Sequence, residues 1–179
     1  KALGAEIELN DGYIRAIAPN GLKGNHILFP SVSVGATENL LMAATLADGE
    51  TQISNAAREP EVGDLANCLI AMGAHIEGVG TDTLKVSGVT QLKGTSYEVI
   101  PDRIETGTYA VAAAMTGGEI VLKATQLKFL NVVVDILNRA GVEVSEEETG
   151  IRVRRMGNMV NGTDVMTEPY PGFPTDMQA

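Results

Sequence analysis

The hydrophobic positions of this chain follow a helical spacing in two segments that lie far apart in the sequence. Residues 62–72 place apolar side chains three and four positions apart, and so do residues 128–140. The positions that we expect to face a core are Val62, Leu65, Leu69 and Met72 in the first segment and Leu130, Val133, Val134 and Leu137 in the second. The pattern therefore predicts two amphipathic helices.

Each predicted helix stands within the same series of elements. A helix is predicted before it, at residues 35–47 and again at 105–115, and a glycine turn and a short strand follow. The strands that we expect are residues 51–54, 75–78 and 83–87 in the first series and 119–123, 142–145 and 150–155 in the second. Gly73 and Gly141 stand where a left-handed residue is wanted at the end of a helix. The order of elements is βαβαββ.

Repeated sequence supports this repeated pattern. Residues 3–8 (LGAEIE), 72–77 (MGAHIE) and 140–145 (AGVEVS) are similar, and their glycines are 69 and 68 residues apart. Residues 47–53 (ADGETQI) and 116–122 (TGGEIVL) match across the same distance of 69. A fixed spacing with repeated residue types indicates a repeated supersecondary unit of α/β type.

Composition narrows the class of protein. The chain has 179 residues, of which 44% are hydrophobic, so it can bury a core and is not disordered. The net charge of −10 argues against nucleic-acid and anionic-membrane binding, and three arginines at 152, 154 and 155 are too few to change this. No apolar run reaches the roughly 18–20 residues of a membrane span. An anionic small molecule stays possible where local donors overcome the repulsion.

Both ends of the sequence look cut. Residues 1–5 read as the last turn of a helix, and residues 175–179 read as the start of another. Pro101 cannot donate to a strand ladder, so we place a crossing between two domains there. The sequence therefore predicts parts of two domains, residues 1–100 and 101–179.

Local chemistry offers one anion site. Residues 33–35 follow a strand-like run at 26–29 and open a helix, where unpaired N–H groups and a glycine suit a phosphate. An ordinary helix start capped by Ser33 or Thr37 is the alternative, and local chemistry alone favours it.

Three further positions carry carboxylates within two residues of a proline. Arg58-Glu59 and Asp102-Arg103 each join opposite charges, which indicates structural ion pairs. Asp176 follows Pro174-Thr175, and a helix N-cap is its simplest role.

Four motifs together resemble one enzyme family. They are residues 33–39 (SVGATEN), 55–61 (NAAREPE), 101–108 (PDRIETGT) and 173–179 (FPTDMQA). In this order they closely resemble the UDP-N-acetylglucosamine 1-carboxyvinyltransferases, which are bacterial enolpyruvyl transferases, and the resemblance covers the whole chain. It implies an inside-out α/β barrel fold with two domains of three units each and an active site in the cleft between them. Residues 1–100 would then hold the end of one unit and one complete unit of the first domain.

The resemblance also implies an activity. The family transfers the enolpyruvyl group of phosphoenolpyruvate to the 3-hydroxyl of UDP-N-acetylglucosamine, by addition and then elimination of phosphate. This is the first committed step of peptidoglycan synthesis, it occurs in the cytoplasm, and it uses no metal or organic cofactor. A sister carboxyvinyl transferase with another acceptor is an alternative, and so is a non-catalytic repeat module that binds a partner.

By resemblance, the residues that bind the nucleotide sugar are Ser31, Val32, Ser33, Val34 and Gly35. Ser31 departs from the family pattern, because many members carry a lysine there.

Four other residues receive roles from the same resemblance. Asp176 would accept the proton of the attacking hydroxyl as the general base. Thr175 would help to position the reacting groups. Glu59 and Asp102 would line the cleft in supporting roles.

Other groups of the family are missing from this stretch. The resemblance places a Lys-Asn pair, a loop with a reactive cysteine and several arginines outside it, so we expect the chain alone to be inactive. Cys68 lies within the helix at 62–72, and we expect it to be buried and inert. His26 and His75 lie in strand-like runs without a partner motif, so we expect no metal site.

Overall fold

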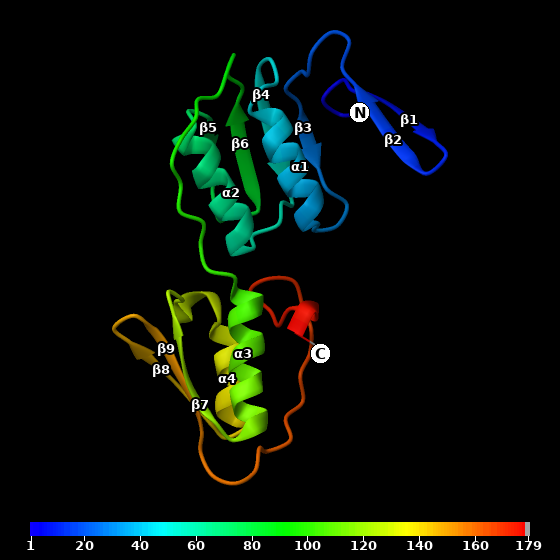
Figure 1. Ribbon diagram of the computed structural model, residues 1–179. Coiled ribbons are helices and arrows are strands. Elements are labelled where there is room, and N and C mark those ends of the chain that lie inside the picture. Colours follow the sequence, from blue (N-terminus) through cyan, green and yellow to red (C-terminus); the bar gives the residue numbers. More distant parts are fainter. Residues whose placement is uncertain (178–179) are drawn as a thin grey trace. The chain divides into compact units, whose positions relative to one another are not determined.

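The computed structural model describes residues 1–177, and the chain divides into two compact units, Lys1–Val99 and Ile100–Ala179. Each unit contains a sheet with two helices packed on one of its faces (Figure 1). The residues predicted at 178 and 179 as part of a helix start lie outside the described residues.

The first unit contains the complete βαβαββ series. Its elements are β3 (His26–Leu28), α1 (Val34–Ala44), β4 (Glu50–Ser54), α2 (Pro60–Ala71), β5 (His75–Glu77) and β6 (Thr83–Ser87). The strand order in the sheet is β3-β4-β6-β5, with β3 parallel to β4 and the other pairs antiparallel. Inward-facing residues of β4 and β6, such as Ile53 and Val86, are fully buried against α1 and α2.

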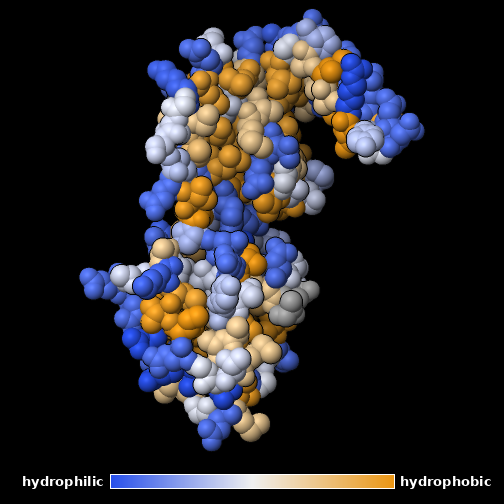
Figure 2. Space-filling view, in the orientation of Figure 1, coloured by the Kyte–Doolittle hydropathy of each residue, from blue (hydrophilic) through white to orange (hydrophobic). Residues whose placement is uncertain are grey.

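A separate hairpin precedes this sheet. Strands β1 (Glu6–Asn10) and β2 (Tyr13–Ile17) pair antiparallel with each other, and among residues 1–177 they pair with no other strand. Leu9 lies opposite Ile14, and the two side chains are 75% and 73% exposed. Figure 2 shows that apolar residues also gather over the helical side of this unit. Met42 of α1 and Leu46, two residues after the end of α1, are exposed. The unit therefore leaves two apolar surfaces uncovered.

The second unit repeats the series from its first helix onward. Its elements are α3 (Arg103–Thr116), β7 (Glu119–Lys123), the 3₁₀ turn η1 (Leu127–Phe129), α4 (Asn131–Arg139), β8 (Val142–Glu147), β9 (Gly150–Arg155) and the 3₁₀ turn η2 (Thr175–Met177). The strand order is β7-β9-β8, and all pairs are antiparallel.

The two units confirm the predicted repeat. Strands β4, β6 and β5 of the first sheet have the same order and directions as β7, β9 and β8 of the second. Gly73 and Gly141 both have the predicted left-handed backbone, with φ of 102° and 84°. The described part of the second unit has no strand before α3, so it follows the order αβαββ.

The buried face of α2 differs from the predicted one. Val62, Ala66 and Leu69 are buried, whereas Leu65 and Met72 are only partly buried. The buried face of α2 is therefore centred nearer Ala66 than expected.

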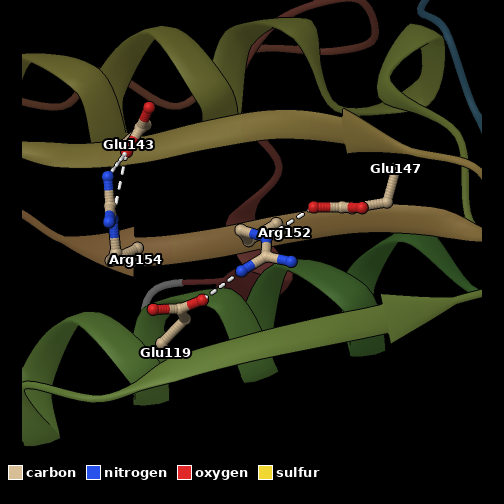
Figure 3. Close-up of polar contacts among 5 residues, drawn as sticks. All are labelled: Glu119, Glu143, Glu147, Arg152 and Arg154. Carbon is tan, nitrogen blue, oxygen red and sulfur yellow. Dashed lines mark hydrogen bonds and ion pairs between the residues drawn. The ribbon is translucent and has the colours of Figure 1, made fainter.

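Charged side chains pair across the outer face of the second sheet (Figure 3). Arg152 lies between Glu119 of β7 and Glu147 of β8 and bonds to both, and these two glutamates raise the pKa of its guanidinium. Arg154 contacts Glu143 through its Nη2, 2.6 Å from Oε2. The strand expected at 150–155 is therefore present, and these two arginines are matched by carboxylates.

Candidate functional site

The start of α1 presents unpaired backbone donors. Ser33 is its N-cap in an extended conformation, and Ser33 Oγ accepts from the Ala36 N–H at 3.3 Å. Within residues 1–177, the N–H groups of Val34 and Gly35 have no acceptor, as expected for the first turn of a helix. A Cβ added at Gly35 would meet no atom within 4 Å. The site therefore has donors and open space, and the capping role of Ser33 is present beside them.

The segment before α1 is open to solvent. Ser31 and Val32 are both exposed, and they join β3 to the helix. Residues 31–33 and the first two residues of α1, of which Val34 is half-buried, therefore form one segment, the loop at 31–35, which ends on the N–H groups of the helix. Such an end attracts a negatively charged group through its aligned peptide dipoles.

Glu59 stands at the start of α2 with a buried carboxylate. It occupies the N-cap position before Pro60, and the residue is only 9% exposed. Its Oε2 has no hydrogen-bond partner among the described residues, although a buried carboxylate oxygen without a partner is costly. The expected ion pair with Arg58 is absent from the same residues, and Arg58 is exposed. Glu59 is thus placed to accept a donor from outside the described residues.

Asp102 caps the first helix of the second unit. Its Oδ1 accepts from the N–H groups of Ile104 at 2.8 Å and Glu105 at 3.1 Å. The neighbouring Arg103 is 9% exposed, and its guanidinium carbon lies 5.5 Å from the centre of the Tyr170 ring. A capping role for Asp102 is therefore established, and any ligand contact would be additional to it.

Thr175 and Asp176 lie on a short turn that packs against α3. Both side chains are exposed, and the turn η2 begins at Thr175. Its last residue, Met177, fills the space beside Gly107, because a Cβ on Gly107 would come within 2.5 Å of Met177 Cε. Asp176 lies within this turn, and the N–H groups that it would cap belong to residues outside the described part of the chain, so its expected N-cap role stays a prediction.

The predicted site residues lie at corresponding ends of the two units. Ser33 and Asp102 are 69 residues apart, and each caps the first helix of its unit. Thr37 and Thr106, one turn later, each donate from Oγ1 to the carbonyl of the cap residue at 2.7 Å. The helix-start end of each unit thus carries the candidate site.

Sequence reasoning missed two contributors to this end, of which Thr37 is buried and Asn55 is half-buried. Thr37 appeared only as an alternative cap, and Asn55 appeared only within a motif. In the structure both hold the segment before Glu59 in place through side-chain hydrogen bonds. The spacing of 69 between Thr37 and Thr106 is the signal that could have revealed the first of them.

Cys68 is not buried as expected. It is partly exposed on α2, on a different side from Ala66 and Leu69. Burial and Asp64 raise the pKa of Tyr97 to about 12, and Cys68 adds to this rise. The rotated packing face of α2 accounts for the error.

The two histidines do not join a metal-binding group. Among residues 1–177 no set of three or more His, Cys, Asp or Glu side chains could hold a metal ion. The Nε2 atom of His26 instead lies 3.1 Å from the Oγ atom of Ser54. The described residues also contain no helix long and apolar enough to cross a membrane.

Solved structures define the class of protein to which this fold belongs. The enolpyruvyl transferase NikO of Streptomyces tendae superposes with a TM-score of 0.84 and 22% identity, over 99% of this chain and 45% of that one. An EPSP synthase of Acinetobacter baumannii superposes with a TM-score of 0.62 over 86% of this chain and 37% of that one. The expected enolpyruvyl transferase fold, in part, is therefore confirmed.

The sequence places the chain within that class. It belongs to the EPSP synthase (3-phosphoshikimate 1-carboxyvinyltransferase) family, whose model matches residues 1–179. Two relatives carry the name UDP-N-acetylglucosamine 1-carboxyvinyltransferase. The protein of Paramagnetospirillum magneticum is 60% identical over 177 residues, and that of Gluconobacter oxydans is 61% identical over 179. The chain spans 41% and 43% of their lengths.

Proposed function

We propose that this chain is the middle part of an enzyme that transfers the enolpyruvyl group of phosphoenolpyruvate to the 3-hydroxyl of UDP-N-acetylglucosamine. The observation that carries the proposal is the 60% identity over 99% of the chain to a relative of that name. In this reaction the 3-hydroxyl oxygen bonds to C2 of phosphoenolpyruvate while C3 gains a proton. The bond from C2 to the phosphate oxygen then breaks, and C3 loses a proton. No metal or organic cofactor takes part.

The first unit would hold the nucleotide sugar. The open N–H groups of Val34 and Gly35 suit a diphosphate, and they provide local donors in a chain with a net charge of −10. Ser31, Val32 and Ser33 would line the approach to them. Glu59, with a buried oxygen that has no partner within residues 1–177, would accept a donor from a substrate or from another part of the enzyme.

The second unit would supply the base. Asp176 is exposed and is held on α3 by Met177, so its carboxylate can face a substrate hydroxyl and accept its proton. Thr175, beside it, would position the reacting groups, and Asp102 would add a contact while it caps α3.

The uncovered surfaces support a larger enzyme around this chain. The hairpin β1–β2 corresponds to β5–β6 and β8–β9, because each follows a left-handed glycine at position 4, 73 or 141. The other two hairpins pack against helices, whereas Leu9 and Ile14 are exposed. We propose that residues 1–100 hold the end of one unit and a whole unit of a first domain, and that residues 101–179 belong to a second. The enzyme would act in the cytoplasm, in peptidoglycan synthesis, and so in cell shape and division.

A chimeric enzyme tests the function. The 177-residue matching region of the Paramagnetospirillum magneticum relative is replaced by this chain, and phosphate release is measured with phosphoenolpyruvate and either UDP-N-acetylglucosamine or 3-phosphoshikimate. We expect phosphate release with phosphoenolpyruvate and UDP-N-acetylglucosamine, and none with phosphoenolpyruvate and 3-phosphoshikimate. A folded chimera that releases no phosphate with the nucleotide sugar, or that prefers 3-phosphoshikimate, contradicts the proposal. The isolated 179-residue chain is expected to be inactive.

A further inference from the structure

Thr37 joins the two segments that carry the proposed ligand-binding residues of the first unit. Its Oγ1 donates to the carbonyl of Ser33 at 2.7 Å and accepts from the N–H of Ala57 at 3.0 Å. Ser33 belongs to the loop at 31–35, and Ala57 stands two residues before Glu59. Thr37 is 0% exposed, so water cannot replace either bond. One hydroxyl therefore links the helix start to the Glu59 segment.

Asn55 provides a second link between the same segments. Its Nδ2 donates to the carbonyl of Phe29 at 3.0 Å, two residues before Ser31. Its backbone is left-handed, with φ of 58°, which turns the chain from β4 toward Glu59. The loop at 31–35 and the segment at 55–59 are thus joined by two side-chain hydrogen bonds to the backbone.

The second unit shows which part of this arrangement is common to the repeat. Thr106 keeps the bond to the cap carbonyl, but its hydroxyl lies 3.3 Å from the Thr125 side chain instead of a backbone N–H. Asn55 has Ala124 as its counterpart, which has no amide to donate. The second unit thus forms its sheet without these two links, and they occur where the nucleotide-sugar loop is proposed.

We infer that Thr37 and Asn55 are positioning residues, which fix the distance between the loop at 31–35 and the carboxylate of Glu59. The inference rests on the proposed function. Without the Thr37 hydroxyl, the N–H of Ala57 would be buried with no acceptor, and the segment would move to find one. Glu59 would move with it, and the loop and the carboxylate would no longer fit one substrate together.

The experiment uses the chimeric enzyme described above. Thr37→Val removes the hydroxyl at nearly constant volume, Thr37→Ser keeps it, and Asn55→Gly removes the amide while it permits the same backbone. Thr45→Val is the matched control, because Thr45 is also 0% exposed in the region of α1 and bonds the carbonyl of Met42 at 2.7 Å, away from the site. The readouts are KM for UDP-N-acetylglucosamine, kcat and the melting temperature.

A positioning role predicts a distinct pattern. Thr37→Val should raise KM for the nucleotide sugar roughly tenfold with a kcat change of about threefold or less. Asn55→Gly should raise KM by a smaller factor, and Thr37→Ser should stay near the parent. Thr45→Val should lower the melting temperature without a change in KM.

Two results would overturn the inference. If Thr37→Val and Asn55→Gly lower the melting temperature but leave KM at the value of Thr45→Val, both residues serve stability alone. If Thr37→Val does not fold, a normal KM for Asn55→Gly decides against the role. Failure of the proposed function is seen separately, because the unsubstituted chimera then shows no turnover with UDP-N-acetylglucosamine.

Discussion

Asn55 and Ala124 occupy the same place in the two units, and both have a left-handed backbone. They are 69 residues apart, each directly follows the first strand after the first helix, and their φ angles are 58° and 57°. Asparagine adopts this conformation readily, whereas in alanine the Cβ clashes with the backbone at a cost of roughly 1–2 kcal/mol. The second unit thus holds a strained residue where the first does not.

Replacing Ala124 with the residue of the first unit should relieve this strain. We expect Ala124→Asn to raise the free energy of unfolding by about 0.5–1 kcal/mol, measured by urea denaturation. Ala112→Asn is the control, since Ala112 is exposed within α3, where asparagine lowers stability by roughly 0.6 kcal/mol. Equal losses from both substitutions would show that Ala124 is not strained.

The buried hydroxyl of Thr51 should also be removable. Its Oγ1 is buried in the first core and has no partner among the described residues. A hydroxyl that is buried without a hydrogen bond costs free energy, so Thr51→Val should stabilise the chain by about 1 kcal/mol. Thr45→Val, which removes a bonded hydroxyl, should instead destabilise it. Thermal unfolding of both variants tests this. If Thr51→Val lowers the melting temperature as Thr45→Val does, the Thr51 hydroxyl makes a hydrogen bond to a partner outside the described residues.

Tyr97 should make stability depend on alkaline pH. Burial, the hydrogen bond from its hydroxyl to Asp64 Oδ1 at 2.8 Å, and the charges of Asp64 and Cys68 raise its pKa to about 12. The folded-state pKa lies above the unfolded value near 10, so the folded state keeps the proton longer. This stability is fully present below about pH 10 and is lost as the pH rises through about 12.

Replacement by phenylalanine tests this dependence. Tyr97→Phe should lower the melting temperature at pH 8 and should lose less between pH 10 and about 12 than the parent does. Tyr109→Phe is the control, because it removes the same hydroxyl from a tyrosine that is 51% exposed on α3. Identical pH profiles for the parent and Tyr97→Phe would contradict the assignment.

The hairpin β1–β2 should exchange its amide protons faster than its counterparts. A two-stranded sheet with an exposed apolar face has little stability of its own, whereas β5–β6 and β8–β9 are covered by helices. Hydrogen exchange followed by mass spectrometry should show low protection at residues 6–17 of the isolated chain. In the chimera the same residues should be protected, and equal protection in both would mean that nothing further covers the hairpin.

The carboxylate of Asp176 should be needed for turnover. General-base assistance is worth roughly 10²–10⁴ in rate, so Asp176→Asn in the chimera should lower kcat by about that factor. UDP-N-acetylglucosamine should still bind by calorimetry, since the loop at 31–35 is unchanged. Asp164→Asn, at another exposed position of the second unit, is the control. A near-normal kcat for Asp176→Asn would remove this residue from the mechanism.

Much of the fold could be predicted because glycines and repeated spacings report directly on local geometry. Gly73 and Gly141 marked the helix ends, and strands β6, β7 and β9 begin and end where the sequence indicated. The face of α2 could not be predicted in detail, because alanine gives a weak hydrophobic signal and Ala66 did not stand out. The rotation of that helix then left Cys68 partly exposed.

The candidate site was predictable only through motifs. Ser33 is recognisable as a helix cap, but no local pattern shows that Glu59 has a buried oxygen without a partner in the described residues. The bond from Ala57 to Thr37 joins residues 20 positions apart through a backbone group, which leaves no trace in residue type. Such contacts depend on tertiary structure and need coordinates.

The hairpin has a consequence for the behaviour of the isolated chain in solution. Within the described part of the chain, β1 and β2 pair only with each other, so each presents an outer edge of N–H and C=O groups beside the exposed Leu9 and Ile14. Free edges next to apolar side chains invite pairing with the same edge of another molecule. The isolated chain should therefore self-associate as its concentration rises, and assays of its substrate binding require dilute protein.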